Sequence, residues 1–295
     1  MCPSAAIASW PSCSRRAISG AERPAAPWLA LVAPAGALHG QDVEGHADAV
    51  LELAVQAEAA GFDSLVLDGR SPDQRDPFVL LGAAAAVTAR LGLGALCNSA
   101  IWPASVLAKT VASLDVCSLG RAIALVAPAA GGDAQASAEA LEVCRLMLRT
   151  PAPSFAGVTQ RIERAWNEPR ARRASPTPVG LVVEPADLED AARLAGLILA
   201  AGRAADLVLI GASEHSGTFD HLAGVAAALG AAAAACGRLP ASLHAVALVE
   251  NASELSLPAA AELLAGGLVG LALRWPGRAP LPGELADWRA RLAPR

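Results

Sequence analysis

Short apolar runs alternate with segments of helical spacing along nearly the whole chain. Runs that are apolar throughout and separated by helices are typical of parallel strands covered on both faces. Eight β/α units over roughly 265 residues predict an α/β fold, the (β/α)8 TIM barrel. A doubly wound open sheet is the alternative, but no G-x-G-x-x-G follows the first run. The eight runs are WLALVAP (28–34), SLVLD (64–68), LGLGALC (91–97), AIALVAP (122–128), VGLVVE (179–184), DLVLIG (206–211), LHAVALVE (243–250) and GLVGLALRW (267–275).

The segments between these runs carry apolar residues on one helical face. In the segment 46–61, Val50, Leu51 and Ala54 fall at helical spacing, and Gly61 follows as a C-terminal stop. We therefore expect residues 28–295 to form one barrel domain behind a disordered leader at 1–27. The other expected helices cover 77–90, 104–117, 134–148, 187–202, 221–237, 258–267 and 283–292.

Composition excludes several classes of protein. With 54% hydrophobic and 17% charged residues the chain is too apolar to be disordered, and a net charge of -5 offers no basic field for nucleic acid. Each apolar run is broken before it could span a bilayer, and the N-terminus lacks the apolar core of a signal peptide. The six cysteines form no C-x-x-C pair and no metal-ligand spacing with histidine. We expect a cytoplasmic protein with no metal and no membrane partner.

One strand run ends on a carboxylate and a glycine, Asp68-Gly69, within FDSLVLDGRSP. In a TIM barrel the side chains at the carboxyl ends of strands face the active site. Asp68 is therefore a candidate for chemistry. The competing interpretation is that Asp68 opens a polar turn in which Gly69 supplies a positive φ.

The stretch from Ala57 to Arg121 resembles the bacterial luciferase-like flavin monooxygenase superfamily. Its AEAAGFDS, acidic strand end, LLGAAAAVTARLGLG and LAKTVASLDVCSLGR are similar to family motifs. The D-G strand end resembles most the subgroup of nitrilotriacetate, pristinamycin and dibenzothiophene-sulfone monooxygenases. Beyond Pro151 the resemblance is faint.

The resemblance implies an FMN-binding barrel in which reduced FMN, supplied by a separate flavin reductase, reacts with O2 to oxidise a small organic substrate. It places Asp68 and Gly69 near the flavin ring edge, with Asn98 and Ser99 as hydrogen-bonding neighbours. The competing interpretation of Asn98 and Ser99 is an ordinary turn start after an apolar strand. Gly131, in AAGGD after the fourth run, would border the same pocket. The resemblance also implies a homodimer formed through helices of the first half.

Several other residues carry open alternatives. His39, in the first loop, is the candidate catalytic acid or base, or a solvated loop histidine. Trp102 either stacks over the pocket or packs under the following helix. Asp115 and Arg121 are expected to form an internal ion pair. Arg70 could bind an anionic group, although such a loop arginine is more often solvated. Most of the remaining strand ends look apolar, which predicts a hydrophobic pocket.

The chain departs from the family where the phosphate should bind. VEPADLEDAAR stands in place of the usual phosphate-binding turn and offers carboxylates, which repel a phosphate dianion. Three functions therefore stay open. They are a reduced-FMN monooxygenase, which we favour, a deazaflavin-dependent hydride-transfer oxidoreductase, and a non-catalytic barrel subunit that has lost flavin binding.

Overall fold

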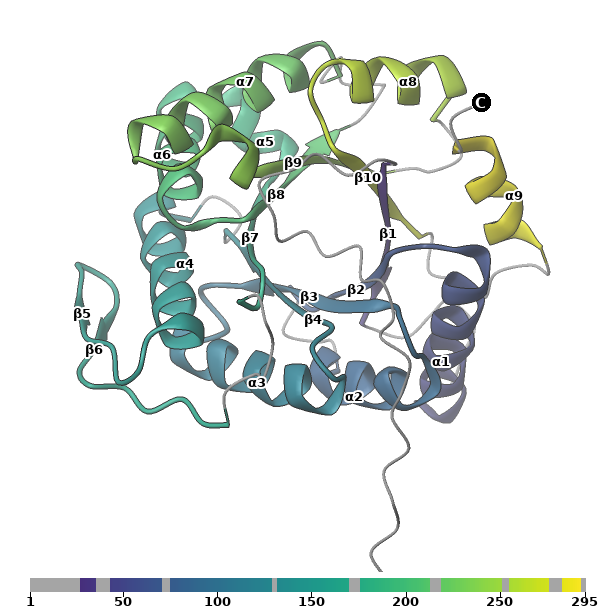
Figure 1. The fold of residues 1–295 in the computed structure, drawn as a ribbon, viewed down its shortest axis with the longest axis horizontal. Coiled ribbons are helices and arrows are strands. Elements are labelled where there is room, and N and C mark those ends of the chain that lie inside the picture. The colour runs from purple at the N-terminus through teal and green to yellow at the C-terminus, as the bar shows by residue number, and fades with distance from the viewer. Residues whose placement is uncertain are drawn as a thin grey trace, which may run out of the picture.

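Eight parallel strands close into a barrel in the part of the chain that the structure, a computed structural model, describes. That part comprises residues 27–35, 43–70, 75–128, 132–169, 176–212, 219–250, 255–275 and 283–292. The order around the barrel is β1-β10-β9-β8-β7-β4-β3-β2, so the prediction of a (β/α)8 barrel is confirmed (Figure 1). The strands are β1 (Trp28–Pro34), β2 (Ser64–Asp68), β3 (Gly92–Asn98), β4 (Ala122–Ala127), β7 (Val179–Val183), β8 (Leu207–Ala212), β9 (His244–Val249) and β10 (Gly270–Arg274).

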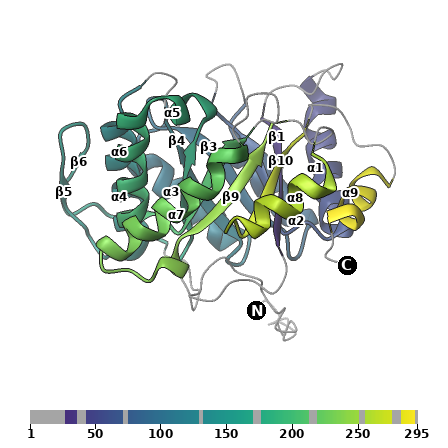
Figure 2. The same ribbon diagram turned by 90° about the horizontal axis from the view of Figure 1, so that it is seen from above.

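Helices surround the barrel on its outside (Figures 1 and 2). The segment predicted as one helix at 187–202 is two helices, because the Asp190 carboxylate accepts hydrogen bonds from the backbone N–H groups of Ala192 and Arg193, both at 3.0 Å, and so starts a new helix. The helices are α1 (Val43–Ala60), α2 (Pro77–Val87), α3 (Ala104–Cys117), α4 (Ala134–Arg149), α5 (Pro185–Glu189), α6 (Ala191–Ala204), α7 (Phe219–Ala235), α8 (Leu257–Ala265) and α9 (Glu284–Leu292), with a short 3-10 helix, η1 (Pro240–Ser242).

The barrel strands are buried on both faces. On each strand, alternate side chains fill the barrel interior, as Val66 and Leu96 do, while the residues between them pack under the helices, as Leu65 does. This two-sided burial explains why the strand runs read as continuously apolar. None of the helices in the described ranges combines the length and apolar content that a bilayer span requires.

A small hairpin that the sequence did not predict lies beside α4, outside the barrel (Figure 1). It consists of β5 (Phe155–Ala156) and β6 (Arg161–Ile162). The buried Glu139 carboxylate of α4 accepts hydrogen bonds from the backbone N–H groups of Val158 at 2.8 Å, Thr159 at 2.7 Å and Gln160 at 2.9 Å. Burial opposes ionisation of Glu139, but the hydrogen bonds outweigh it and lower its pKa to about 2.

The family-like motifs of the first half build the N-terminal end of the barrel. The Glu58 carboxylate of α1 accepts hydrogen bonds from the backbone N–H groups of Arg90 at 2.7 Å and Leu91 at 2.8 Å, which enter β3. Burial raises the pKa of Glu58, but these N–H groups outweigh burial and lower it overall. The Asp63 carboxylate accepts a hydrogen bond from the Leu29 N–H at 2.8 Å. These residues stabilise the barrel and lie away from its mouth.

Asp115 and Arg121 are structural, but Arg121 does not make the expected ion pair. Its guanidinium donates to the Ser118 carbonyl at 2.7 Å, the Thr88 hydroxyl at 2.8 Å and the carbonyls of Ala85 and Leu91. The Asp115 carboxylate accepts from the N–H of Ala122, the first residue of β4, at 3.1 Å. Three backbone carbonyls and the Thr88 hydroxyl thus accept the hydrogen bonds of Arg121 that were expected to go to a carboxylate.

Candidate active site

Charged residues stand at the carboxyl ends of four barrel strands. Asp68 ends β2, Arg274 ends β10, Glu184 directly follows β7 and Glu250 directly follows β9. Each comes two residues after a side chain that fills the barrel interior, and side chains two apart on a strand share a face. All four side chains therefore start on the inner side of the barrel mouth.

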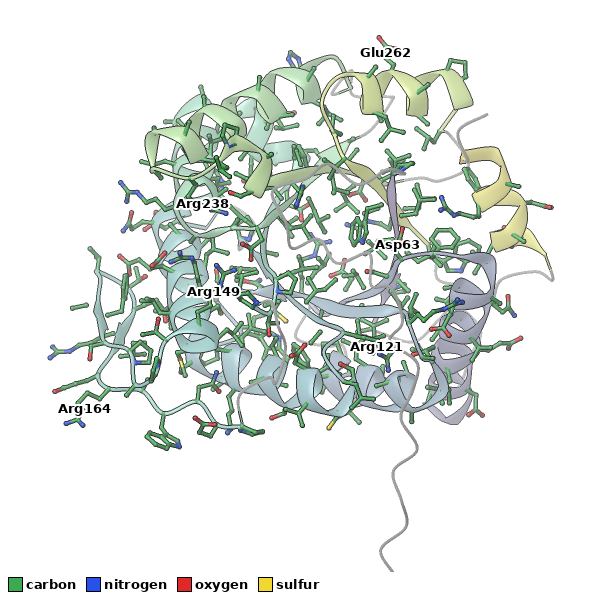
Figure 3. All side chains as sticks on the ribbon, in the orientation of Figure 1. Asp63, Arg121, Arg149, Arg164, Arg238 and Glu262 are labelled. Carbon is green, nitrogen blue, oxygen red and sulfur yellow. The ribbon has the colours of Figure 1, made fainter. Side chains whose placement is uncertain are left out.

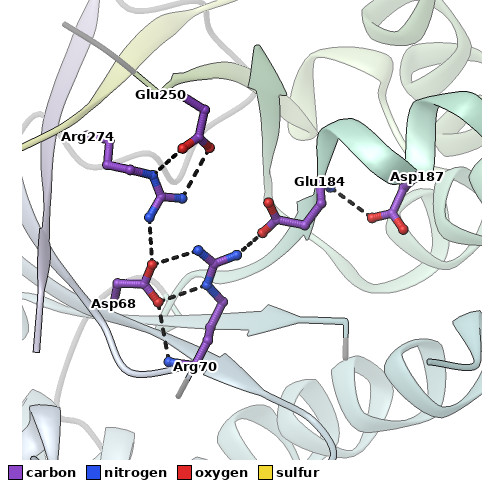
Figure 4. A network of polar contacts seen from close by, with 6 residues as sticks. All are labelled: Asp68, Arg70, Glu184, Asp187, Glu250 and Arg274. Carbon is purple, nitrogen blue, oxygen red and sulfur yellow. Dashed lines mark hydrogen bonds and ion pairs between the residues drawn. The ribbon is translucent and has the colours of Figure 1, made fainter. Parts of the chain in front are cut away.

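Asp68 and Arg70 form a two-point ion pair (Figure 4). The Nε of Arg70 donates to Asp68 Oδ1 at 2.8 Å, and Nη2 donates to Oδ2 at 2.6 Å. The Arg70 backbone N–H also donates to Oδ1, at 3.3 Å. Two parallel N–H···O bonds are the strongest arrangement that a guanidinium makes with a carboxylate. Arg70 is thus held directly above the end of β2.

Arg274 joins the same carboxylate from the other side (Figure 4). Its Nη1 donates to Asp68 Oδ2 at 2.6 Å, and its Nη2 donates to Glu250 Oε1 at 3.2 Å. Arg70 in turn uses Nη1 to pair with Glu184. The result is one row of alternating charges across the mouth, in the order Glu184, Arg70, Asp68, Arg274, Glu250. We call these five residues the charged chain.

The pKa values follow from this alternation. Burial opposes ionisation of Asp68, but its bonds to Arg70 and the charge of Arg274 outweigh burial and lower its pKa. Burial is also the largest influence on Glu184. The charges of Arg70 and Arg274 do not compensate for it and the nearby Glu250 adds repulsion, so the pKa of Glu184 is raised. Arg70, between two carboxylates, stays charged, because its pKa is raised in spite of burial. At neutral pH the Arg70 guanidinium therefore carries its charge at the mouth.

The expectation of mostly apolar strand ends was wrong. LVVE, ALVE and LALR each end on a charged residue two positions after an inward-facing apolar residue, and this signal was present in the sequence. The expectation of a solvated Arg70 was also wrong, because only 24% of its side chain is exposed. Sequence reasoning could not find Glu184 as its partner, since the two residues are 114 positions apart.

Gly69 is required for a different reason from the one expected. Its φ is not positive, but a Cβ at this position would lie 2.7 Å from Cγ of Pro77 and 3.4 Å from the Leu96 carbonyl oxygen. The Gly69 N–H donates to that same oxygen at 3.0 Å. The glycine thus lets the chain leave β2 in close contact with the end of β3 and the start of α2.

Asn98 and Ser99 lie at the end of β3, beside β2, but no hydrogen bond joins them to the charged chain within the described residues. Asn98 Oδ1 accepts the Ala100 N–H at 2.9 Å, so this oxygen begins the following turn. The Ser99 hydroxyl contacts the buried Ser137 hydroxyl of α4 at 3.2 Å. Within the described residues the Asn98 amide nitrogen has no partner and stays available to a ligand, and the Ser99 hydroxyl keeps further hydrogen-bonding capacity.

Trp102 packs and does not stack over the mouth. Its ring lies 5.4 Å from that of Phe78, at an interplanar angle of 69°, which is an edge-to-face contact with the first turn of α2. His39 and Gly131 lie outside the described residues, as does the leader up to residue 26. Their roles stay predictions.

Carboxylates of the chain itself cap the helices that begin at the mouth. Asp76 accepts the Phe78 N–H at 2.8 Å, Asp133 accepts the Gln135 N–H at 2.9 Å, and Asp190 caps α6 as described above. Three acids of VEPADLED are thus engaged within the chain, namely Glu184 by Arg70, Asp187 by Arg193 and Asp190 by the start of α6. Because these N–H groups already donate to carboxylates, the starts of α2, α4 and α6 do not offer them to a phosphate.

Comparisons with known proteins agree with this architecture. A family model described as luciferase-like monooxygenase matches residues 28–249. The coenzyme F420-dependent tetrahydromethanopterin reductase from Methanopyrus kandleri superposes with a TM-score of 0.71 at 14% identity, covering 90% of this chain and 98% of that one. The monooxygenase RslO1 from Streptomyces bottropensis gives a TM-score of 0.65 at 16% identity, covering 89% and 96%. The long-chain alkane monooxygenase LadA gives 0.65 at 13% identity, covering 90% and 89%. No curated protein matches the sequence.

Proposed function

Because the chain belongs to the luciferase-like monooxygenase family, we propose that it is a flavin-dependent monooxygenase that uses reduced FMN and O2 to oxidise a small organic substrate. The observation that carries this proposal is the pair of guanidiniums held at the barrel mouth by Asp68. Active sites of TIM barrels lie at this end, and buried charges with perturbed pKa values gather at functional sites.

The described part of the mouth fits the ring end of a flavin. The pyrimidine edge of the ring presents carbonyl acceptors and an imide N–H donor, and it carries negative charge in the reduced form at neutral pH. Arg70 and Arg274 each keep N–H groups beyond those that bond Asp68, with side chains 24% and 21% exposed, and Asn98 adds an amide donor. Glu184, 23% exposed, offers an acceptor. We propose that these four residues hold the ring edge.

The phosphate end of the cofactor finds no such match at the starts of α2, α4 and α6, which carboxylates cap. At these three helix starts the chain would then add nothing to the binding of the ring. A flavin held in this way exchanges readily, which supports its delivery by a separate flavin reductase.

Under this proposal the chain positions groups and excludes water. Asp68 is a positioning residue, because it keeps both guanidiniums at fixed places and is itself 7% exposed. Reduced FMN, when bound, would supply two electrons to O2. The apolar barrel interior below the charged chain keeps water away from that reaction, since Val66, Leu96 and Leu248 fill it.

A deazaflavin-dependent hydride transfer is the second candidate. The observation in its favour is chain length. This protein covers 98% of two F420-dependent enzymes, the reductase above and a secondary alcohol dehydrogenase, against 96% of the monooxygenase RslO1 and 89% of LadA. The capped helices, in contrast, favour the third candidate, a barrel subunit that has lost flavin binding.

We further propose a homodimer formed through α2 and α3. The outer face of α2 is apolar although exposed, with Val79 71% and Val87 47% exposed, and Val106 of the neighbouring α3 is 48% exposed. Exposed apolar patches of this kind mark interaction surfaces, and a second copy buries the same residues from both sides.

An anaerobic titration tests the proposed function. Reduced FMN, oxidised FMN and a reduced deazaflavin would each be added to the purified protein, with tryptophan fluorescence as the readout. We expect saturable binding that is tightest for reduced FMN. Preference for the deazaflavin would move the assignment to hydride transfer, and no saturation with any of the three at millimolar concentration would contradict flavin use.

A further inference from the structure

A second group of charged side chains lies at the opposite, N-terminal end of the barrel strands. Arg145 and Arg149 stand four positions apart on α4 and therefore share one helical face. Arg238 follows α7, and Asp206 directly precedes β8. Figure 3 labels Arg149 and Arg238 on the side of the molecule where α4 and α6 lie. We call Arg145, Arg149 and Arg238 the arginine cluster.

Asp206 is the carboxylate that the arginine cluster shares. Its Oδ2 pairs with Nη2 of Arg149 and accepts the Val179 N–H at 3.0 Å, while its Oδ1 lies 3.7 Å from Nη2 of Arg238. The side chains of Arg149 and Arg238 are 23% and 19% exposed. One carboxylate therefore serves two partly buried guanidiniums and a backbone group.

Arg145 has no hydrogen-bond acceptor within the described residues. Its nearest carboxylate oxygen is Oε1 of Glu142, 3.6 Å from Nη1, although only 31% of the Arg145 side chain is exposed. The Nε atoms of Arg145 and Arg149 are both buried without a hydrogen-bond partner in the part of the chain that the structure describes. Unsatisfied polar groups of this kind are rare in folded proteins and often mark the place of an ion.

The arginine cluster is also short of negative charge. Three guanidiniums with Asp206 carry a charge of +2, which Glu142 reduces to +1. Burial is the largest cause that lowers the pKa of Arg238, Asp206 opposes it, and Arg145 and Arg149 lower the pKa further. Arg145 and Arg149 are thus close enough to Arg238 to repel its charge.

Helix dipoles explain how two of the three arginines are stabilised at their positions. Arg149 lies in the last turn of α4, and Arg238 donates to the Ala201 and Gly202 carbonyls at the end of α6, at 3.5 and 3.2 Å. Cations at helix C-termini are stabilised in this way. Arg145 stands a full turn before the end of α4, donates to no carbonyl of the described ranges and has no such explanation.

We propose that the arginine cluster binds a phosphate group, as free inorganic phosphate or on a small phosphate monoester. A phosphate carries between one and two negative charges at neutral pH, which matches the charge of the cluster, and its oxygens fit guanidinium forks. Arg145 supplies free donors to it, while Asp206 holds Arg149 and Arg238 in place. The site lies at the barrel end away from the mouth and does not rest on the proposed function.

Calorimetric titration of the full chain with inorganic phosphate, at constant ionic strength, tests the site. We expect one site per chain, with a Kd below about 1 mM. The variant Arg145→Gln should weaken binding at least tenfold, whereas Arg90→Gln, which removes an exposed arginine remote from the cluster, should leave the Kd unchanged. Circular dichroism and Tm establish that both variants fold.

A second variant and a second ligand sharpen the result. Arg145→Lys keeps the charge but loses the fork, so it should bind with a Kd between those of the wild type and Arg145→Gln. Phenyl phosphate in place of inorganic phosphate tells a monoester site from a site for the free ion. No saturation up to 20 mM with either ligand, or equal affinities of Arg145→Gln and Arg90→Gln, would overturn the proposal.

Discussion

Replacing Asp68 by Asn tests whether the charged chain at the mouth holds together as the contacts indicate. The substitution keeps the shape of the side chain but removes the charge that two guanidiniums share, through contacts of 2.6 to 2.8 Å. An amide has one acceptor oxygen and presents an NH2 group to donors, so it retains at most one of the two sides. Removing one partner of a buried ion pair costs about 3–5 kcal/mol. Because the arginine side chains are 21–24% exposed and water can partly replace Asp68, we expect the lower end, about 3 kcal/mol.

The assay is urea unfolding followed by tryptophan fluorescence, with Asp48→Asn on the exposed face of α1 as the matched control. At pH 7 the Asp68→Asn variant should lose about 3 kcal/mol of its free energy of unfolding and the control less than about 0.5 kcal/mol.

The loss of stability should depend on pH with a definite sign. The folded-state pKa of Asp68 is lowered, so its contribution is fully present above the unfolded value near 3.8 and is lost as the pH falls through the folded value. A loss below about 1 kcal/mol at pH 7, or a loss that does not shrink below pH 4, would refute the reasoning.

Three further substitutions have definite expected outcomes. Glu139→Gln should lower the free energy of unfolding by about 2 kcal/mol and speed amide exchange in the β5–β6 hairpin, because an amide cannot accept all the N–H groups that the carboxylate does. Because the pKa of Glu139 is about 2, its contribution to stability is present above pH 4.5 and is lost as the pH falls toward 2. An unchanged exchange rate in the variant would contradict this account of the hairpin. Gly69→Ala should cost about 1–3 kcal/mol in urea unfolding, since its Cβ would lie 2.7 Å from Cγ of Pro77, and a neutral effect would show that Pro77 gives way. Val79→Arg should convert a dimer to a monomer in sedimentation analysis while Val158→Arg, 87% exposed on the hairpin, should not, and equal behaviour of the two variants would exclude α2 as the interface.

The fold could be predicted from the sequence because the barrel strands are buried on both faces. Two-sided burial makes each strand a continuous apolar run, and all eight runs became strands whose ends differ from the predicted ones by at most three residues. The β5–β6 hairpin was missed because its strands have two residues each and carry no such run. Its position depends on Glu139, a contact to another part of the chain.

The candidate site was predictable only in part, because apart from Asp68-Gly69 the most recognisable motifs lie at the end of the barrel opposite the mouth. Glu58, Asp63 and Arg121 belong to the family-like stretch and hold the N-terminal end together. They identified the fold and carried little information about chemistry. The mouth depends on pairs such as Asp68 with Arg274, which are 206 positions apart in one sequence. A search for charged residues at every strand end would have found the members of the charged chain, although not their pairing.

The most direct test of the central claim is the affinity of reduced FMN for the Arg274→Gln variant, measured anaerobically beside the wild type and Arg90→Gln. Arg274 stands at the carboxyl end of β10 and binds both Asp68 and Glu250, whereas Arg90 is exposed before β3 at the other end of the barrel. If the guanidiniums of the mouth hold the reduced ring, Arg274→Gln should raise the Kd at least tenfold, which corresponds to about 1.4 kcal/mol, and Arg90→Gln should leave it unchanged. Equal affinities in all three proteins would contradict a flavin site at this mouth.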